Sequence, residues 1–208
     1  MNRSSNDVAL TLADSANTLQ ARGGELILLN GPSGSGKSLW LHRMAELAAL
    51  PPDITIRLTH ANQDAPAVRM LFDRWPAIWL GQTVKEELMF GLNRQPAPQL
   101  LDRALQQWGL SEIAQSTELQ MLNRLQSLRL SLAAMSLADP ALVLLDNPTA
   151  ALCEKDAQAV IRDIQDWRQQ TNTIVVVACN RWQDWRFSAS QCWRVNAPDA
   201  LPLPGGPA

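Results

Sequence analysis

Glycine and histidine are scarce in the second half of this 208-residue sequence. No glycine occurs between Gly109 and Gly205, and both histidines, His42 and His60, precede the midpoint. Functions that need a glycine-rich loop or a histidine late in the chain are therefore excluded. Tyrosine is absent, whereas there are eight tryptophans, most of which we expect to pack in the core.

Positive charge is also sparse. Only three lysines occur, Lys37, Lys85 and Lys155, the arginines are scattered, and the formal net charge is −2. Surfaces that bind nucleic acid neutralise phosphates with clustered lysine and arginine. The sequence therefore predicts no nucleic-acid partner.

Long apolar runs are missing as well. The apolar stretches at 26–29 and 141–145 have the length of buried strands, far short of the roughly 18 residues of a membrane span. Residues 1–14 are polar and do not resemble a secretory signal. Three widely spaced cysteines, Cys153, Cys179 and Cys192, favour reduced thiols over a disulfide framework or a metal site. These features together predict a cytoplasmic protein.

The clearest motif that is present is a phosphate-binding P-loop. It lies between an apolar strand pattern at 26–29 and a helical pattern at 39–44, and its residues are Gly31, Pro32, Ser33, Gly34, Ser35, Gly36, Lys37 and Ser38. Strand, glycine-rich turn and helix together let successive backbone N–H groups surround a chain of phosphates. In this motif Lys37 is expected to reach the β- and γ-phosphates, and the Ser38 hydroxyl to bind Mg²⁺.

A second motif ends in a single carboxylate. Residues 142–145 are all apolar and are followed by Asp146. This is the pattern of a Walker B strand, which places its carboxylate where it can hold the same Mg²⁺ as Ser38. The predicted metal ligands are therefore Ser38 and Asp146, and the predicted cofactors are ATP and Mg²⁺.

Strand and helix patterns alternate along the chain, which predicts an α/β fold. We expect strands at 8–12, 26–29, 54–58, 68–72, 141–145, 174–178 and 191–195, and helices at 38–50, 83–92, much of 98–138 and 157–170. Thr83 and Glu86 form a capping-box pattern at the start of one helix. The predicted fold is a P-loop NTPase whose mostly parallel sheet has helices on both faces. We expect one domain over residues 1–197 and a disordered Pro/Gly-rich tail over residues 198–208.

The residues after the Walker B strand point to a family. Asp146-Asn147-Pro148-Thr149-Ala150-Ala151-Leu152 resembles the LDEPTxxLD segment of ATP-binding cassette (ABC) transporter ATPases. Residues 76–79, 83–88, 138–141 and 173–178 also resemble parts of that family, in the same order and at about the same spacing. The sequence is most similar in character to the ATPases of importers and energy-coupling-factor transporters. The resemblance implies an inserted helical subdomain at roughly 83–137.

The same resemblance reveals several departures from the family pattern. The LSGGQ signature is replaced by Leu122-Asn123-Arg124-Leu125-Gln126, which lacks both glycines. Other family positions hold unusual residues: the switch histidine is Cys179, the D-loop aspartate is Cys153, and the Q-loop glutamine is Asp73 or Arg74. Asn147 stands where the family has its catalytic glutamate. An amide cannot accept a proton from water at neutral pH, and loss of a general base typically costs about 10²–10⁴ in rate.

We therefore interpret the chain as an ATP-binding subunit of an ABC-type transporter whose own hydrolysis is weak or depends on a partner. The resemblance implies a dimer with another ABC ATPase subunit. It also implies a membrane permease that holds the protein on the inner face of the plasma membrane. No residue is assigned as catalytic, and the transported substrate and the occurrence of hydrolysis are open.

Two other hypotheses remain. A nucleotide-dependent regulatory or assembly protein would use ATP to lock one conformation. Another P-loop enzyme, such as a kinase, would use residues 31–38 alone, although the 146–149 segment and the long helical insert disfavour it. The loop at 75–80 is expected either to dock a permease or to pack within the domain.

Overall fold

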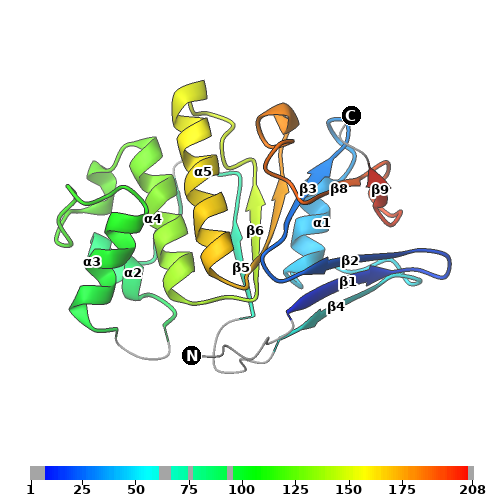
Figure 1. The fold of residues 1–208 in the computed structure, drawn as a ribbon, viewed down its shortest axis with the longest axis horizontal. Helices are drawn as coiled ribbons and strands as arrows, with labels where there is room; N and C mark the ends of the chain where they lie inside the picture. Colours follow the sequence, from blue (N-terminus) through cyan, green and yellow to red (C-terminus); the bar gives the residue numbers. More distant parts are fainter. Residues whose placement is uncertain (1–7, 61–66, 75–76, 93–95, 206–208) are drawn as a thin grey trace.

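The computed structural model describes residues 8–60, 67–74, 77–92 and 96–205, which form two β-sheets and the helices around them (Figure 1). An antiparallel sheet in the order β2-β1-β4 contains β1 (Ala9–Ala13), β2 (Thr18–Arg22) and β4 (Thr55–Thr59). The larger sheet has the order β5-β6-β7-β3-β8-β9. Its strands are β3 (Leu26–Asn30), β5 (Val68–Leu71), β6 (Leu142–Asp146), β7 (Ile174–Ala178), β8 (Gln191–Arg194) and β9 (Leu203–Gly205). Every pairing in it is parallel except that of β8 with β9.

Two hydrophobic cores lie on opposite faces of the large sheet. Side chains of a strand alternate between faces, so Leu142 and Leu144 of β6 enter one core while Val143 and Leu145 enter the other. The first core also holds apolar residues of the small sheet and of α1 (Lys37–Met44). The expected strands buried on both faces are confirmed for β3, β6 and β7, in which every residue is buried.

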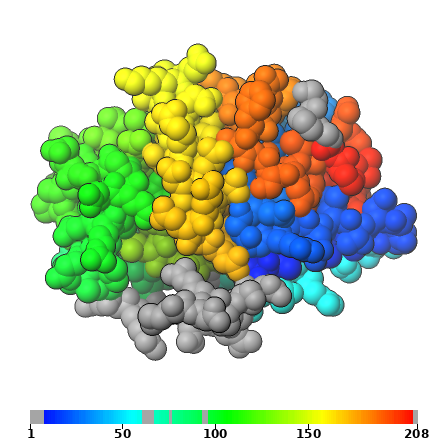
Figure 2. All heavy atoms as spheres, viewed as in Figure 1, coloured from blue at the N-terminus to red at the C-terminus, as the bar shows by residue number. Residues whose placement is uncertain are grey.

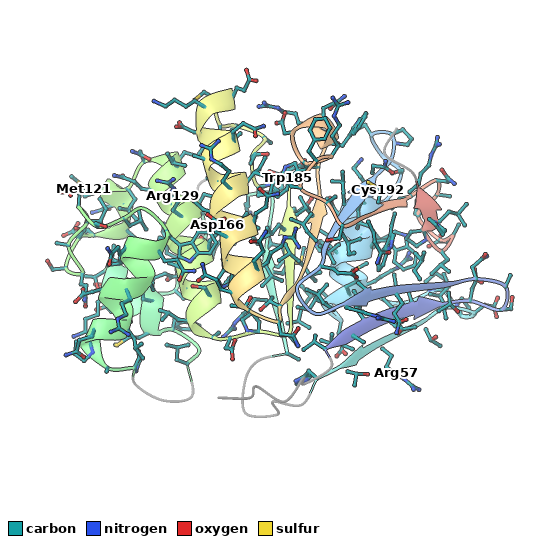
Figure 3. All side chains as sticks on the ribbon, in the orientation of Figure 1. Arg57, Met121, Arg129, Asp166, Trp185 and Cys192 are labelled. Carbon is teal, nitrogen blue, oxygen red and sulfur yellow. The ribbon has the colours of Figure 1, made fainter. Side chains whose placement is uncertain are left out.

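The second core is covered by four helices. These are α2 (Val84–Met89), α3 (Pro98–Gln107), α4 (Arg124–Leu137) and α5 (Glu154–Gln170). Helices α2 to α4 gather at one end of the molecule, and α5 lies between them and the strands (Figures 1 and 2). Arg129 of α4, labelled in Figure 3, pairs with Asp163 of α5 at 2.9 Å, and the rings of Trp108 and Trp167 lie 5.9 Å apart. The helices therefore cover both faces of the sheet, as the sequence predicts. The boundaries of the helical subdomain, 83–137, and of the whole domain, 1–197, stay predictions.

Helix α1 is shorter than the sequence predicts. It ends at Met44 and not near Leu50, because Glu46 adopts a left-handed conformation with φ of 59°. The N–H of Leu47 donates to the carbonyl of His42, and the N–H of Glu46 donates to that of Arg43. This is a Schellman ending, which usually has glycine where Glu46 stands, so no residue at this position signals the end of the helix.

The prediction of a disordered tail over residues 198–208 is wrong for the part that the structure describes. Strand β9 pairs with β8, and Leu201 is buried. Arg43 of α1 donates hydrogen bonds to the carbonyl of Pro198 and to the carboxylate of Asp199. Pairing with β8 and bonds from a buried arginine of α1 thus order a segment whose proline and glycine content alone suggests disorder.

Two local predictions are confirmed. The capping box is present, since the Thr83 hydroxyl accepts from the N–H of Glu86 and the Glu86 carboxylate accepts from the N–H of Thr83. Most of the tryptophans are core residues, because five are at most 3% exposed: Trp40, Trp108, Trp167, Trp185 and Trp193.

Candidate functional site

The candidate site lies at the edge where the parallel strands of the large sheet end. In register, Leu29 of β3 and Asp146 of β6 are both paired with Ala178 of β7, and Leu71 of β5 is paired with Leu145. The residues that follow these strands therefore meet at one edge, which is where ligands bind in open α/β sheets. The structure thus brings together four predicted features: the loop at 31–36, Asp73, Asn147 and Cys179.

The P-loop follows β3 as predicted, and two of its glycines are required by close contacts. Gly31 has φ of 150°, and a Cβ there would lie 2.3 Å from the carbonyl oxygen of Val195. Gly36 has φ of 99°, and a Cβ there would lie 2.8 Å from the Cα of Pro198. The loop is therefore shaped by the segment that follows β8 as well as by its own sequence.

Lys37 is the first residue of α1 and is only 7% exposed. Its Nζ donates to the carbonyls of Gly31 at 2.9 Å and Pro32 at 3.0 Å, so the ammonium is held against the loop. Burial lowers the pKa of Lys37, and the neighbouring Cys179 and Asp146 act in the opposite direction. A buried ammonium beside exposed loop backbone favours an anionic ligand, which would offset the cost of its desolvation.

The two predicted metal ligands contact each other. The Ser38 hydroxyl donates to Oδ1 of Asp146 at 3.0 Å. Burial raises the pKa of Asp146, the hydrogen bond from Ser38 lowers it, and the charge of Asp73 raises it further. A cation beside this carboxylate would stabilise its charged form.

The residues present fit a magnesium nucleotide. A hydroxyl and a carboxylate are oxygen ligands of the kind that Mg²⁺ prefers. Ser35, in the loop, is 5% exposed, and its hydroxyl has no hydrogen-bond partner among the described residues. Buried polar atoms are normally paired, so an unpaired hydroxyl within a P-loop is consistent with a ligand that the protein alone does not supply.

Asn147 connects three strand ends through its side chain. It follows β6 with φ of 45°, a left-handed conformation that asparagine tolerates better than most residues. Its Nδ2 donates to Oδ2 of Asp73 at 2.9 Å, and its Oδ1 accepts from the backbone N–H of Asn180 at 3.0 Å. Because the backbone donor can only face the oxygen, the amide nitrogen must face Asp73.

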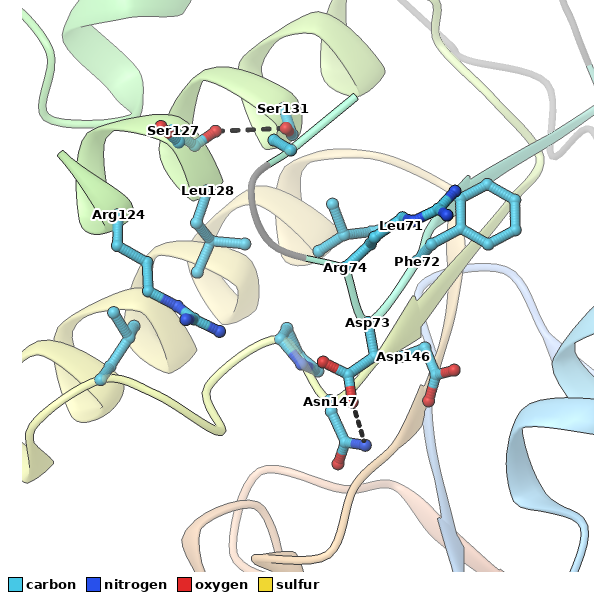
Figure 4. A pocket seen from close by; sticks show the side chains of 13 residues that line it. Leu71, Phe72, Asp73, Arg74, Arg124, Ser127, Leu128, Ser131, Asp146 and Asn147 are labelled. Carbon is cyan, nitrogen blue, oxygen red and sulfur yellow. Dashed lines mark hydrogen bonds between the residues drawn. The ribbon is translucent and has the colours of Figure 1, made fainter. Parts of the chain in front are cut away.

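A pocket opens beside this pair, between the end of β5 and the start of α4 (Figure 4). Asp73, Arg74, Asp146 and Asn147 line it from the strand ends. Arg124 lines it from α4, and Figure 4 shows its side chain extending from that helix into the pocket. Of the two residues expected at the Q-loop position, Asp73 is the one that contacts Asn147.

The segment at the signature position begins α4. The Asn123 side chain accepts from the N–H of Gln126 at 2.9 Å, and the Gln126 side chain accepts from the N–H of Asn123 at 3.0 Å. This capping box satisfies backbone donors that a helix start otherwise leaves unpaired. The departure from LSGGQ therefore has a local structural role, because the asparagine and the glutamine close the end of the helix.

Cys179, at the switch-histidine position, is 3% exposed and follows β7 directly. Burial, followed by the charge of Asp184, raises the pKa of its thiol to about 12, so the group is neutral near pH 7. Cys153 is exposed at the start of α5, where its side chain makes no capping hydrogen bond. All three cysteines are free, in agreement with the prediction of reduced thiols.

The hydrogen bond between Asp73 and Asn147 was not predicted from the sequence. The two residues are 74 positions apart, and neither belongs to a motif that names the other. The available signal was that two predicted strands, at 68–72 and 141–145, are followed by polar residues, Asp73 after the first and Asp146 and Asn147 after the second. Adjacent parallel strands would place those residues together, but the sequence does not show that β5 and β6 are neighbours.

Comparisons with known proteins agree with this fold. Residues 15–150 match the sequence model of the ABC transporter family. An ABC transporter ATP-binding protein of Bifidobacterium longum is 34% identical over 179 residues, which are 77% of this chain and 22% of that protein. The histidine/lysine/arginine/ornithine transport ATP-binding protein HisP of Escherichia coli is 29% identical, with 77% of this chain and 72% of that protein covered.

A solved structure shows the same architecture. This is cbiO1 from Clostridium perfringens, part of the ABC transporter complex cbiONQ, with a TM-score of 0.75 and 15% sequence identity. The alignment covers 97% of this chain and 89% of that one. The predicted α/β P-loop NTPase fold is therefore confirmed. Each helix among the described residues is too short or too polar to span a lipid bilayer.

Proposed function

The chain belongs to the ABC transporter family, and on that premise we propose that it is an ATP-binding subunit that holds MgATP but hydrolyses it weakly or only with a partner. The observation that carries the proposal is the placement of three groups at one strand edge. Lys37 lies against the loop carbonyls, Ser38 contacts Asp146, and residues 32–34 of the loop are exposed.

The proposed roles follow the chemistry of each group. The backbone of residues 31–38 would surround the phosphates, and the Lys37 ammonium would neutralise the terminal ones. Ser38 and Asp146 would hold Mg²⁺, which neutralises the charge that develops on the phosphates during hydrolysis. Because Oγ of Ser38 and Oδ1 of Asp146 are already 3.0 Å apart, a cation could bind both oxygens with little rearrangement.

Weak hydrolysis is proposed from two side chains. Asn147 has both ends of its amide engaged, with Asp73 and with Asn180, and an amide is not a proton acceptor. Cys179 is a buried thiol with a raised pKa of about 12, so it cannot act like an imidazole near pH 7. The chain thus keeps the groups that would bind phosphate and Mg²⁺, whereas the groups that activate water in the family are replaced at positions 147 and 179.

Transport is proposed from the relatives that are named as transport ATP-binding proteins. We expect a membrane permease and a second ABC ATPase subunit as partners, with the chain at the inner face of the plasma membrane. A partner surface is supported by the loop before α2, where Ile78 and Leu80 are each 61% exposed. Trp79 between them packs partly against the core, so it would hold the loop in place.

A binding experiment tests the proposal. Trace labelled MgATP is mixed with excess purified protein, and both bound label and its conversion to ADP are followed. We expect label that binds and remains largely ATP, and no binding to Lys37→Ala. Lys85→Ala, which removes a lysine from α2, is the matched control and should bind normally. Equal ATP affinity in Lys37→Ala and the unchanged protein would refute the P-loop assignment.

A further inference from the structure

The pocket between the end of β5 and the start of α4 contains a carboxylate that has no role in the proposed nucleotide site. Among the described residues that line the pocket, two carry carboxylates, Asp146 and Asp73. Asp146 is engaged by the Ser38 hydroxyl and is the proposed metal ligand. Asp73 accepts a hydrogen bond from Asn147 and is otherwise exposed to solvent.

Asp73 and Asn147 form a pair in which the carboxylate and the amide follow the ends of the neighbouring strands β5 and β6. The backbone N–H of Asn180 fixes the amide oxygen of Asn147, so the amide nitrogen is directed at Asp73 and holds it at 2.9 Å. One such bond occupies one of roughly four acceptor sites of a carboxylate. The remaining sites can accept a water molecule.

From this geometry we infer that Asp73 is the general base for the ATP hydrolysis that this chain performs, and that Asn147 positions it. The inference rests on the proposed function, because it assigns a further residue to the same nucleotide site. Asn147 cannot accept a proton, whereas its direct partner can. The carboxylate thus reaches the site from the segment that follows β5, next to the amide of the residue that follows β6.

The step assigned to Asp73 balances without any further reactant. The Asp73 carboxylate takes a proton from a water molecule as the water oxygen forms a bond to the terminal phosphorus. The bond from that phosphorus to the bridging oxygen breaks, and its electron pair remains on ADP. Asp73 then returns the proton to solvent, to which it is exposed.

The test compares Asp73→Asn with a matched control, Asp102→Asn. Asp102 is also exposed and also accepts from a side-chain amide, that of Gln115 at 2.6 Å, but it lies on α3. In single turnover, Asp73→Asn should bind trace MgATP with unchanged affinity and convert it about 10²-fold more slowly. Asp102→Asn should match the unchanged protein in both respects.

Two further measurements separate a base from a structural residue. In Asp73→Ala, added formate should restore part of the conversion, because it can occupy the space of the lost carboxylate; in Asp102→Ala it should have no effect. Without nucleotide, the NMR signal of the Asn147 side-chain amide should shift in Asp73→Asn and stay in place in Asp102→Asn. That shift reports the hydrogen bond independently of hydrolysis.

Several results would overturn the inference. In single turnover, these are an unchanged rate or a lowered ATP affinity in Asp73→Asn, or ATP that binds to the unchanged protein but is never converted. In the other two measurements, they are the absence of a formate effect on Asp73→Ala and an Asn147 amide signal that does not shift in Asp73→Asn. Failure of the unchanged protein to bind ATP would instead refute the proposed function, and the inference with it.

Discussion

Replacing Asn147 with glutamate is the obvious way to restore the family's catalytic residue, and we expect it to fail. The substitution removes the amide that donates to Asp73 at 2.9 Å and places a second carboxylate beside it. It also puts glutamate at φ of 45°, where asparagine is tolerated and longer side chains are not favoured. Cys179 and the altered signature segment remain in place.

The free-energy cost can be worked from these contacts. Loss of an exposed hydrogen bond costs about 1 kcal/mol. Repulsion between two exposed carboxylates adds about 1 kcal/mol, since solvent screens most of the Coulomb energy at this separation. The left-handed backbone adds about 1 kcal/mol more. Asn147→Glu should therefore lower the free energy of unfolding by about 3 kcal/mol, and no rate gain should accompany it.

Asn147→Gln separates the terms, because glutamine has the length of glutamate, keeps an amide and adds no charge. It should cost only about 1 kcal/mol, mainly from the backbone. Urea unfolding at low and high salt provides the assay, and the difference between the two variants should shrink as salt screens the repulsion. Equal stability of the two variants, or a rate gain of about 10² in Asn147→Glu, would refute the reasoning.

Three further predictions concern the surroundings of the site. Cys153 is exposed, whereas Cys179 is 3% exposed and has a pKa raised to about 12. A thiol reagent at pH 8 should therefore modify Cys153 within minutes and leave Cys179 unmodified until the protein unfolds. Arg43→Ala should lower stability by about 3 kcal/mol and speed proteolysis within 198–205, because the buried guanidinium bonds the carbonyls of Ala49 and Pro198. Asp199→Asn, which removes a carboxylate whose side chain is 80% exposed, should cost less than about 1 kcal/mol in the same urea assay, and an equal cost would contradict this account. Gly36→Ala should destabilise by about 2 kcal/mol, measured the same way, since φ is 99° and the new Cβ would meet Pro198 at 2.8 Å; a neutral effect would contradict the observed packing.

The strands of the large sheet could be predicted because their signal is local. The run at 141–145 is apolar throughout, and β6 begins at Leu142, within one residue of the expected start. Strand β2 was missed because only Leu19 and Ala21 of its five residues are apolar. Strand β9 was missed because its residues, Leu203 to Gly205, include a proline and a glycine and form a strand only through their pairing with β8.

The candidate site also has one part that the local sequence predicts and another that depends on contacts between distant residues. Residues 31–38 form a continuous motif, so their sequence predicts the loop and its place before a helix. The end of α1 depends on one left-handed residue, Glu46, that carries no glycine signal. Contacts between strand ends depend on strand order, which no local pattern contains. The partner of Asn147 is therefore visible only in the folded chain.

That partner changes how the departures from the family pattern are understood. Taken separately, an amide at position 147 removes a base, and a carboxylate at position 73 is an unrelated substitution. Taken as a hydrogen-bonded pair, they keep one carboxylate and one amide at adjoining ends of β5 and β6. A second carboxylate at 147 would break this pairing and repel Asp73. The two departures are thus physically coupled, and the effect of either residue depends on the other.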